Sequence, residues 1–180
     1  HHYPQEHYDF WRRDLPHVPA ERFCTGGFGE NLATVGMTEQ CVCAGDIFRF
    51  GTALIQVSQA RQPCWKLNVR FGVPDMAQRV QESARTGWYY RVLEPGVVAL
   101  ESEIRLIDRP HPDGPLARLL HHLYADPLNT RALKDIAALT SVAQLSECVE
   151  RAVARRGFAQ RVVARCQAIV GRRQTRVDVL

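Results

Sequence analysis

The sequence contains no run of about 18 consecutive apolar residues, the length that a membrane-spanning helix requires. It shows no secretory signal and no lipidation motif at either end. These absences argue against an integral membrane protein, and we expect a cytoplasmic protein without a membrane partner. With 180 residues the chain is long enough to bury one substantial hydrophobic core.

Common metal and phosphate motifs are also missing. The six cysteines form no CxxC pair, the histidines form no HxH or HExxH arrangement, and no GxxxxGK[ST] loop occurs. This cysteine usage is typical of a reducing compartment. Cys41 and Cys43 would share one face of a strand, and we expect them to pack in the core rather than bind a metal. We expect surface positions for five histidines: His7, His17, His111, His121 and His122.

The chain up to residue 108 has the pattern of a β-rich domain. Short alternating or β-branched segments separated by glycines predict strands near residues 41–43, 47–50, 53–57 and 97–107. Strands this short and this frequent favour a barrel or a strongly bent sheet. Helical spacing predicts one helix through Tyr8, Trp11 and Leu15, and a second from Pro74 through Val80.

The remaining sequence predicts helices. Residues 109–115 contain three prolines and one glycine, which indicates a linker. After it, apolar residues recur at helical spacing from Leu116 onward and predict a small bundle. Eight arginines and no acid lie between Arg151 and Arg176. Because no aromatic stacking residues accompany them, we expect a solvated helix surface rather than a nucleic-acid partner.

One cysteine stands in a chemically suggestive setting. Cys64 lies between Arg61 and Lys66, and nearby positive charge favours the thiolate, which attacks electrophiles and binds soft metals. Pro63 fixes φ just before it, so the turn that presents the sulfur should be rigid. The sequence therefore indicates a nucleophile or metal ligand, with a small buried residue at a strand end as the alternative.

Several motifs occur in a characteristic order along the chain. They are HYP at 2–4, FGENLATVG at 28–36, GDIF at 45–48, RQPCWKL at 61–67, GWYYRVL at 87–93 and PG at 95–96. In this order and separation they resemble the MOSC family, named for the C-terminal domain of molybdenum cofactor sulfurases. Within that family the chain looks most like the bacterial proteins that reduce N-hydroxylated bases such as hydroxylaminopurine.

The resemblance implies a mainly β fold with α-helices. A MOSC-type β-barrel at 1–108 would be followed by the linker at 109–115 and by a small C-terminal helical bundle at 116–180. Family members also have earlier strands with a histidine-glycine-glycine motif and an aspartate. We therefore expect that the barrel domain lacks its N-terminal strands here and that a segment precedes His1. The second Gly-Asp turn of the family is replaced by Glu101-Ser102-Glu103.

The resemblance also implies the chemistry. It predicts a molybdopterin-dependent oxidoreductase that reduces N-hydroxylated compounds such as hydroxylaminopurine, with no use of pyridoxal phosphate. Cys64 would be the catalytic residue and the molybdenum ligand, since a thiolate is a soft donor suited to a metal that changes oxidation state. Nothing in the sequence resembles a flavin or nicotinamide site, so a separate reductase protein is expected to donate electrons. Homodimerisation stays open.

The cofactor carries a phosphate and a polar pterin ring, so cations and amides are expected around Cys64. Arg61 suits a forked contact with phosphate or pterin oxygens, and Lys66 can act as a point charge. Asn31 matches a family position near the cofactor, and its amide can donate and accept hydrogen bonds. Three further residues are candidates, with local backbone bonding as the alternative for each: Glu30, Ser58 and Asn68.

Two other functions remain open from the sequence. The same fold could carry sulfur as a persulfide on Cys64, because that role also needs a reactive thiolate. Alternatively, the chain could be a non-enzymatic binding module that uses its basic C-terminal helices. Binding through phosphate groups would then weaken steeply with salt.

Overall fold

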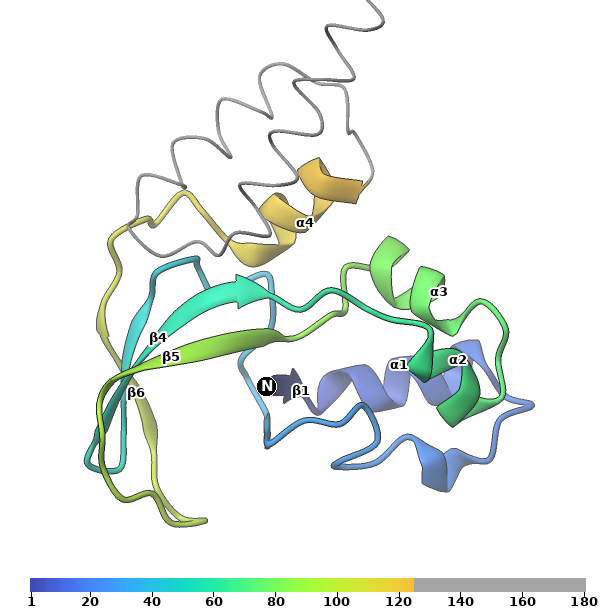
Figure 1. The fold of residues 1–180 in the computed structure, drawn as a ribbon, viewed down its shortest axis with the longest axis horizontal. Coiled ribbons are helices and arrows are strands. Elements are labelled where there is room, and N and C mark those ends of the chain that lie inside the picture. The colour runs from blue at the N-terminus through green and yellow to red at the C-terminus, as the bar shows by residue number, and fades with distance from the viewer. Residues whose placement is uncertain (125–180) are drawn as a thin grey trace, which may run out of the picture.

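We describe residues 1–124 of the chain from a computed structural model. Six strands form one sheet in the order β2-β1-β5-β4-β3-β6. The strands are β1 (His2–Pro4), β2 (Leu32–Thr34), β3 (Ile47–Phe50), β4 (Ala53–Ala60), β5 (Trp88–Glu94) and β6 (Ile104–Asp108). Only β1 and β2 pair in parallel; the other neighbours are antiparallel. The sheet curls into a half barrel, which confirms the expected mainly β fold with helices (Figure 1).

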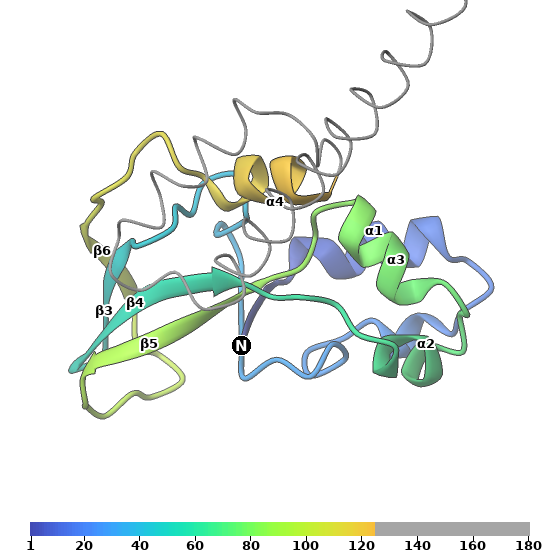
Figure 2. The same cartoon turned by 45° about the horizontal axis from the view of Figure 1, so that its top comes forward.

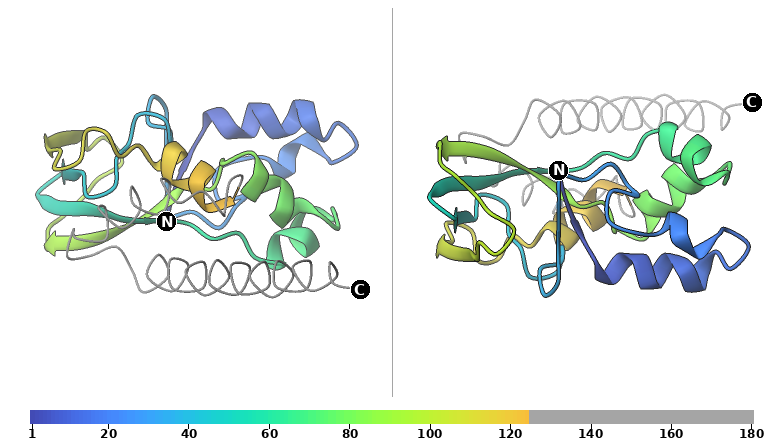
Figure 3. Two further views of the ribbon diagram at one scale, coloured as in Figure 1. Left: turned by 90° about the horizontal axis from the view of Figure 1, so that it is seen from above. Right: turned by 90° about the horizontal axis from the view of Figure 1, so that it is seen from below.

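Three helices gather at the other end of the described part, as the views from above and below make clear (Figure 3). They are α1 (Glu6–Asp14), α2 (Lys66–Phe71) and α3 (Met76–Glu82), with a 3-10 turn at η1 (Ala20–Arg22). The fourth helix, α4 (Leu116–Tyr124), lies over the sheet (Figure 2). None of these described helices has the length and apolar character needed to cross a membrane.

The helical end is held together by a cluster of aromatic rings around Phe28. Its ring stacks on Tyr3 with centroids 4.3 Å apart and meets Phe71 at 4.7 Å. Tyr8 and Trp11 of α1 are buried in the same cluster, which confirms the predicted first helix. Burying such rings supplies most of the stabilisation available to short helices.

A second cluster fills the concave side of the sheet. Phe48, Ile55, Val57 and Trp88 pack there against Leu116 and Leu119 of α4. The helix begins where the change of period predicts it, directly after residues 109–115. The other predicted C-terminal helices, including the arginine-rich segment, lie outside the described residues.

One predicted strand is wrong, and another is shorter than predicted. Residues 41–43 form a turn with a single bridge from Cys43 to Pro115. The strand predicted over 97–107 begins only at Ile104, because the chain around Val97 bonds instead to the tight turn between β3 and β4. There the Thr52 and Val97 backbones are joined at 3.1 Å, and a Cβ at Gly96 would meet the Ala53 nitrogen at 2.3 Å.

Candidate functional site

The loop that carries Cys64 runs from the end of β4 to the start of α2, crossing from the sheet to the helical end (Figure 1). The backbone N–H of Arg61 donates to the Gly87 carbonyl at 2.9 Å, which fastens the loop to β5. Pro63 follows, and the Cys64 carbonyl then accepts the N–H of Leu67 at 3.0 Å. Cys64 thus lies just before the N-cap of α2, and its side chain is exposed.

Helix α2 was not expected from the sequence, although its signals are present. Leu67 and Phe71, four residues apart, are buried, and Gly72 ends the helix with φ +69°. A glycine adopts this left-handed conformation without a Cβ clash. The six-residue helix therefore fixes the direction in which the Cys64 loop leaves the core.

Arg61 has a feature that local structure does not explain. Its side chain is half-buried, and the Nη1 atom is fully buried without a hydrogen-bond partner in the described part of the chain. A buried donor left unsatisfied costs about 1–3 kcal/mol, so native proteins rarely leave one without a reason. A bound anion beside Arg61 would satisfy this donor.

The sheet register brings the ends of β1, β2, β4 and β5 together at this point. His2 pairs with Leu32 and with Trp88, and Trp88 pairs with Ala60. Arg61 follows Ala60 and lies opposite Gly87, whereas Asn31 precedes Leu32 and lies beside His1, whose amine donates to Asn31 Oδ1 at 2.8 Å. Burial raises the pKa of Tyr3, on which the charges of Arg61 and Glu30 act with opposite sign. The charges of Arg61 and Glu30 therefore both act at Tyr3 and at the His1 amine, to which Asn31 is bonded.

Glu30 is used by its own loop. Its carboxylate accepts the backbone N–H groups of Gly26 at 2.8 Å and Phe28 at 2.9 Å, and also the hydroxyl of Tyr8. Burial and this carboxylate both raise the pKa of Tyr8. These bonds hold the loop of residues 26–30 in place against Tyr8. They also fix the position of the Glu30 carboxylate, which acts with Arg61 on Tyr3.

The other candidates differ in how their polar atoms are used. Asn68 donates to the Pro74 carbonyl at 2.5 Å and accepts from the Ala77 N–H at 2.8 Å, which joins α2 to α3. Ser58 donates to the Tyr89 carbonyl at 3.1 Å. Lys66 is exposed and forms no ion pair with the described residues, so its charge is available to a ligand near Cys64.

A buried histidine on β1 was not recognised as structural from the sequence. Nδ1 of His2 bonds to the Tyr90 hydroxyl at 2.8 Å and Nε2 to the Thr34 hydroxyl at 2.7 Å. Burial, with a smaller contribution from the terminal amine, lowers the pKa of His2 to about 4. The neutral ring therefore donates one of these bonds and accepts the other, locking β1 between β2 and β5.

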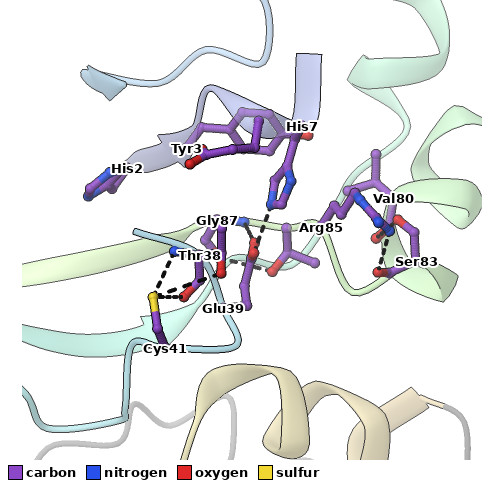
Figure 4. A network of polar contacts seen from close by, with 12 residues as sticks. His2, Tyr3, His7, Thr38, Glu39, Cys41, Val80, Ser83, Arg85 and Gly87 are labelled. Carbon is purple, nitrogen blue, oxygen red and sulfur yellow. Dashed lines mark hydrogen bonds and ion pairs between the residues drawn. The ribbon is translucent and has the colours of Figure 1, made fainter. Parts of the chain in front are cut away.

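A second buried group, His7 with Glu39, corrects the expected surface position of His7. His7 Nε2 lies 2.7 Å from one carboxylate oxygen of Glu39, and the other oxygen accepts the N–H of Gly87 at 2.7 Å (Figure 4). No sequence motif marks this pair, because its members are 32 residues apart and their contact depends on the tertiary fold.

The structure separates the two cysteines that were expected to share a strand face. Cys43 is buried, as expected, and burial followed by the charge of Asp46 raises its thiol pKa. Cys41 is exposed, so the expected core position is wrong for it. Within residues 1–124 no group of three potential metal-ligating side chains comes together.

Comparison with known proteins gives consistent matches. The family model of the MOSC domain matches residues 1–105. The protein YiiM of Escherichia coli (strain K12) is 51% identical over 108 residues, which are 60% of this chain and 48% of that protein. A protein named Reductase from Gibberella moniliformis (strain M3125 / FGSC 7600) is 41% identical over 113 residues, or 62% of this chain and 20% of that protein.

A solved structure agrees in fold. The crystal structure of YiiM from Escherichia coli superposes with a TM-score of 0.80 at 40% identity, covering 88% of this chain and 76% of that chain. The chain spans about half the length of the curated YiiM protein that it matches.

Proposed function

This chain belongs to the MOSC domain family, and from that premise we propose that it is a molybdenum-cofactor-dependent reductase of N-hydroxylated compounds such as hydroxylaminopurine. The net reaction breaks the N–O bond of the substrate, consumes two electrons and two protons, and releases the amine and water. The resemblance of the chain to a protein named Reductase supports a reductive activity.

The observation that carries this proposal is the pairing of an exposed thiol with a buried, unsatisfied guanidinium. Cys64 is accessible to a ligand, and three residues earlier Arg61 holds a buried N–H that has no partner in the described chain. A cofactor with a phosphate and a polar ring fits this pair, because it would offer oxygen atoms to Arg61 while a soft metal meets the sulfur.

Each residue of the site has a role in this proposal. Cys64 would ligate molybdenum, Arg61 would bind phosphate or pterin oxygens, and Lys66 and Asn31 would add a charge and an amide. When bound, the cofactor supplies a metal centre that accepts oxygen from the N-hydroxyl group. Glu30, Ser58 and Asn68 would act by holding the loops that surround it, through the backbone bonds described above.

The proposal extends to the setting of the protein. We place it in the cytoplasm, where a separate reductase protein would deliver the electrons. The substrate would be a small N-hydroxylated molecule.

Metal analysis of the purified full chain tests the proposal directly. We expect molybdenum in the wild-type protein and a loss of at least about tenfold in Cys64→Ala, together with loss of hydroxylamine reduction. Cys24→Ala is the matched control, since Cys24 is also an exposed thiol and should leave both readouts unchanged. Arg61→Gln should reduce molybdenum retention by about tenfold.

Two outcomes would overturn the proposal. Full molybdenum content in Cys64→Ala would remove the sulfur from the metal site. Labile sulfane sulfur on Cys64 in protein without molybdenum would instead support a persulfide carrier.

A further inference from the structure

A pocket of about 230 Å³ opens beside the buried pair of His7 and Glu39. It lies between α1, the segment 83–85 that follows α3, the first turn of α4 and the segment 38–40. No residue of the Cys64 loop lines it. The pocket is therefore separate from the site of the proposed reductase.

The pocket wall contains a buried, pre-formed polar group. The side chains of His7 and Glu39 are 8% and 4% exposed and lie 2.7 Å apart. Figure 4 shows this pair between α1 and the chain at Gly87, with Ser83 and Arg85 on the neighbouring segment. Both oxygens of Glu39 are occupied, one by His7 and one by the N–H of Gly87.

Two arginines line the same pocket without a carboxylate partner among the described residues. Arg13 donates through Nε to the Asp9 carbonyl at 3.1 Å, and Arg85 donates through Nη1 to the Ser83 carbonyl at 3.2 Å. Each guanidinium therefore keeps further N–H groups available. The remaining acid of the pocket, Glu6, already accepts the N–H of Gly36 at 2.6 Å.

The position of Arg85 is fixed by its neighbours. Ala84 adopts φ +56° at the end of α3, a left-handed conformation that costs an alanine about 1–2 kcal/mol. This turn sends the next residue back toward α1, where the Arg85 guanidinium lies 3.7 Å from the centre of the Phe10 ring. A guanidinium held over an aromatic ring is restricted in position, which favours a forked contact with an anion.

We propose that this pocket binds a small organic anion, a carboxylate or a phosphate monoester, whose charged group is held by Arg13 and Arg85. The hydroxyls of Thr38 and Ser83 lie at the same pocket and can add hydrogen bonds. Its volume is below the range of about 300–1,000 Å³ typical of pockets for drug-sized ligands, so the ligand is a small metabolite.

Titration of the full chain with succinate and with inorganic phosphate, followed by calorimetry and by amide NMR shifts, tests this proposal. We expect saturable binding of at least one anion, with shifts concentrated at Thr38 and at residues 83–85. Preference for succinate would identify a carboxylate site, and preference for phosphate a phosphate site. Arg13→Gln and Arg85→Gln should each weaken binding at least about tenfold.

The control is Arg49→Gln, which removes an arginine that is paired with Glu94 on the sheet, away from the pocket. It should leave the affinity within about twofold of wild type. Cys64→Ala should also bind the anion normally, which separates this site from the molybdenum proposal. The inference is overturned if neither anion saturates, or if the Arg49 variant loses as much affinity as the two pocket variants.

Discussion

Two loops of this molecule combine the same residue types and use them in opposite ways. In the first, Cys43 lies next to Asp46, whose carboxylate receives two hydrogen bonds from Arg109 at 2.9 and 2.7 Å. In the second, Cys64 lies near Arg61, whose buried Nη1 has no partner in the described chain. The first loop contains a buried thiol beside a carboxylate that Arg109 pairs from the segment after β6. The second contains an exposed thiol and a guanidinium whose buried Nη1 has no partner among the described residues.

The difference shows how an arginine that the fold uses differs from one whose donor the fold leaves unpaired. Asp46 is completely buried, so its charge requires a partner, and Arg109 also donates to the Cys41 carbonyl at 2.9 Å. These bonds tie the segment after β6 to the start of β3. Nη1 of Arg61 ties no segments together within residues 1–124, which leaves this donor available for a ligand.

The largest expected effect comes from removing the paired arginine. Arg109→Ala should lower the free energy of unfolding by about 3 kcal/mol, because it leaves the buried Asp46 carboxylate without a counter-charge. Arg61→Ala should change it by less than about 1 kcal/mol, since it removes a donor that is unsatisfied in the fold. Urea unfolding of both variants at one pH measures the contrast. Equal destabilisation would mean that Arg61 is also structural.

The pH range for that comparison is set by His2. Its folded pKa of about 4 lies below the ordinary value of 6.5, so the unfolded chain binds the proton more tightly. The contribution of neutral His2 to the free energy of unfolding is about 3 kcal/mol above about pH 6.5. It is lost progressively as the pH falls toward 4. Urea unfolding of wild type and His2→Gln should be measured between pH 7 and pH 4. The difference in their free energies of unfolding should become smaller as the pH falls from 6.5 to 4. A constant difference would show that His2 does not titrate as the structure indicates.

The two thiols give a smaller but direct contrast. Iodoacetamide should modify Cys64 at least about tenfold faster than Cys43, because alkylation requires an accessible thiolate and Cys43 is buried with a raised pKa. Peptide mapping by mass spectrometry resolves the rate at each cysteine. Exposed Cys24 provides the reference rate for an accessible thiol, and comparable labelling of Cys43 would mean that the first loop opens.

The sequence identifies the elements whose signals are local. The first helix, β3, β4 and α4 follow from the spacing of apolar residues, and the motif around Cys64 leads to the family. The strand expected at 97–107 forms only from Ile104, because the Val97 carbonyl bonds to the Thr52 backbone in the turn between β3 and β4 instead of pairing in the sheet. The β-propensity of a segment does not indicate whether a tertiary contact of this kind will form instead of strand pairing.

For the candidate site, too, residues within sequence motifs could be predicted, and residues brought together only by the tertiary fold could not. The sequence predicts Cys64 and Arg61 from one short motif and Asn31 from another, and these remain predictions. It does not supply His7 with Glu39, or His2 with Tyr90 and Thr34, since each group joins distant segments without a repeated spacing. The expected surface position of His7 failed because its carboxylate partner could not be seen in advance.

Gly87 has a consequence for any attempt to engineer this protein. A Cβ there would meet the His2 carbonyl oxygen at 2.2 Å, and the residue's amide and carbonyl are held by Glu39 and Arg61 on opposite sides. This one residue thus anchors both Glu39 and the start of the Cys64 loop. A side chain introduced at Gly87 would therefore disturb both of these contacts at once, whereas substitutions elsewhere in the Cys64 loop need not affect Glu39.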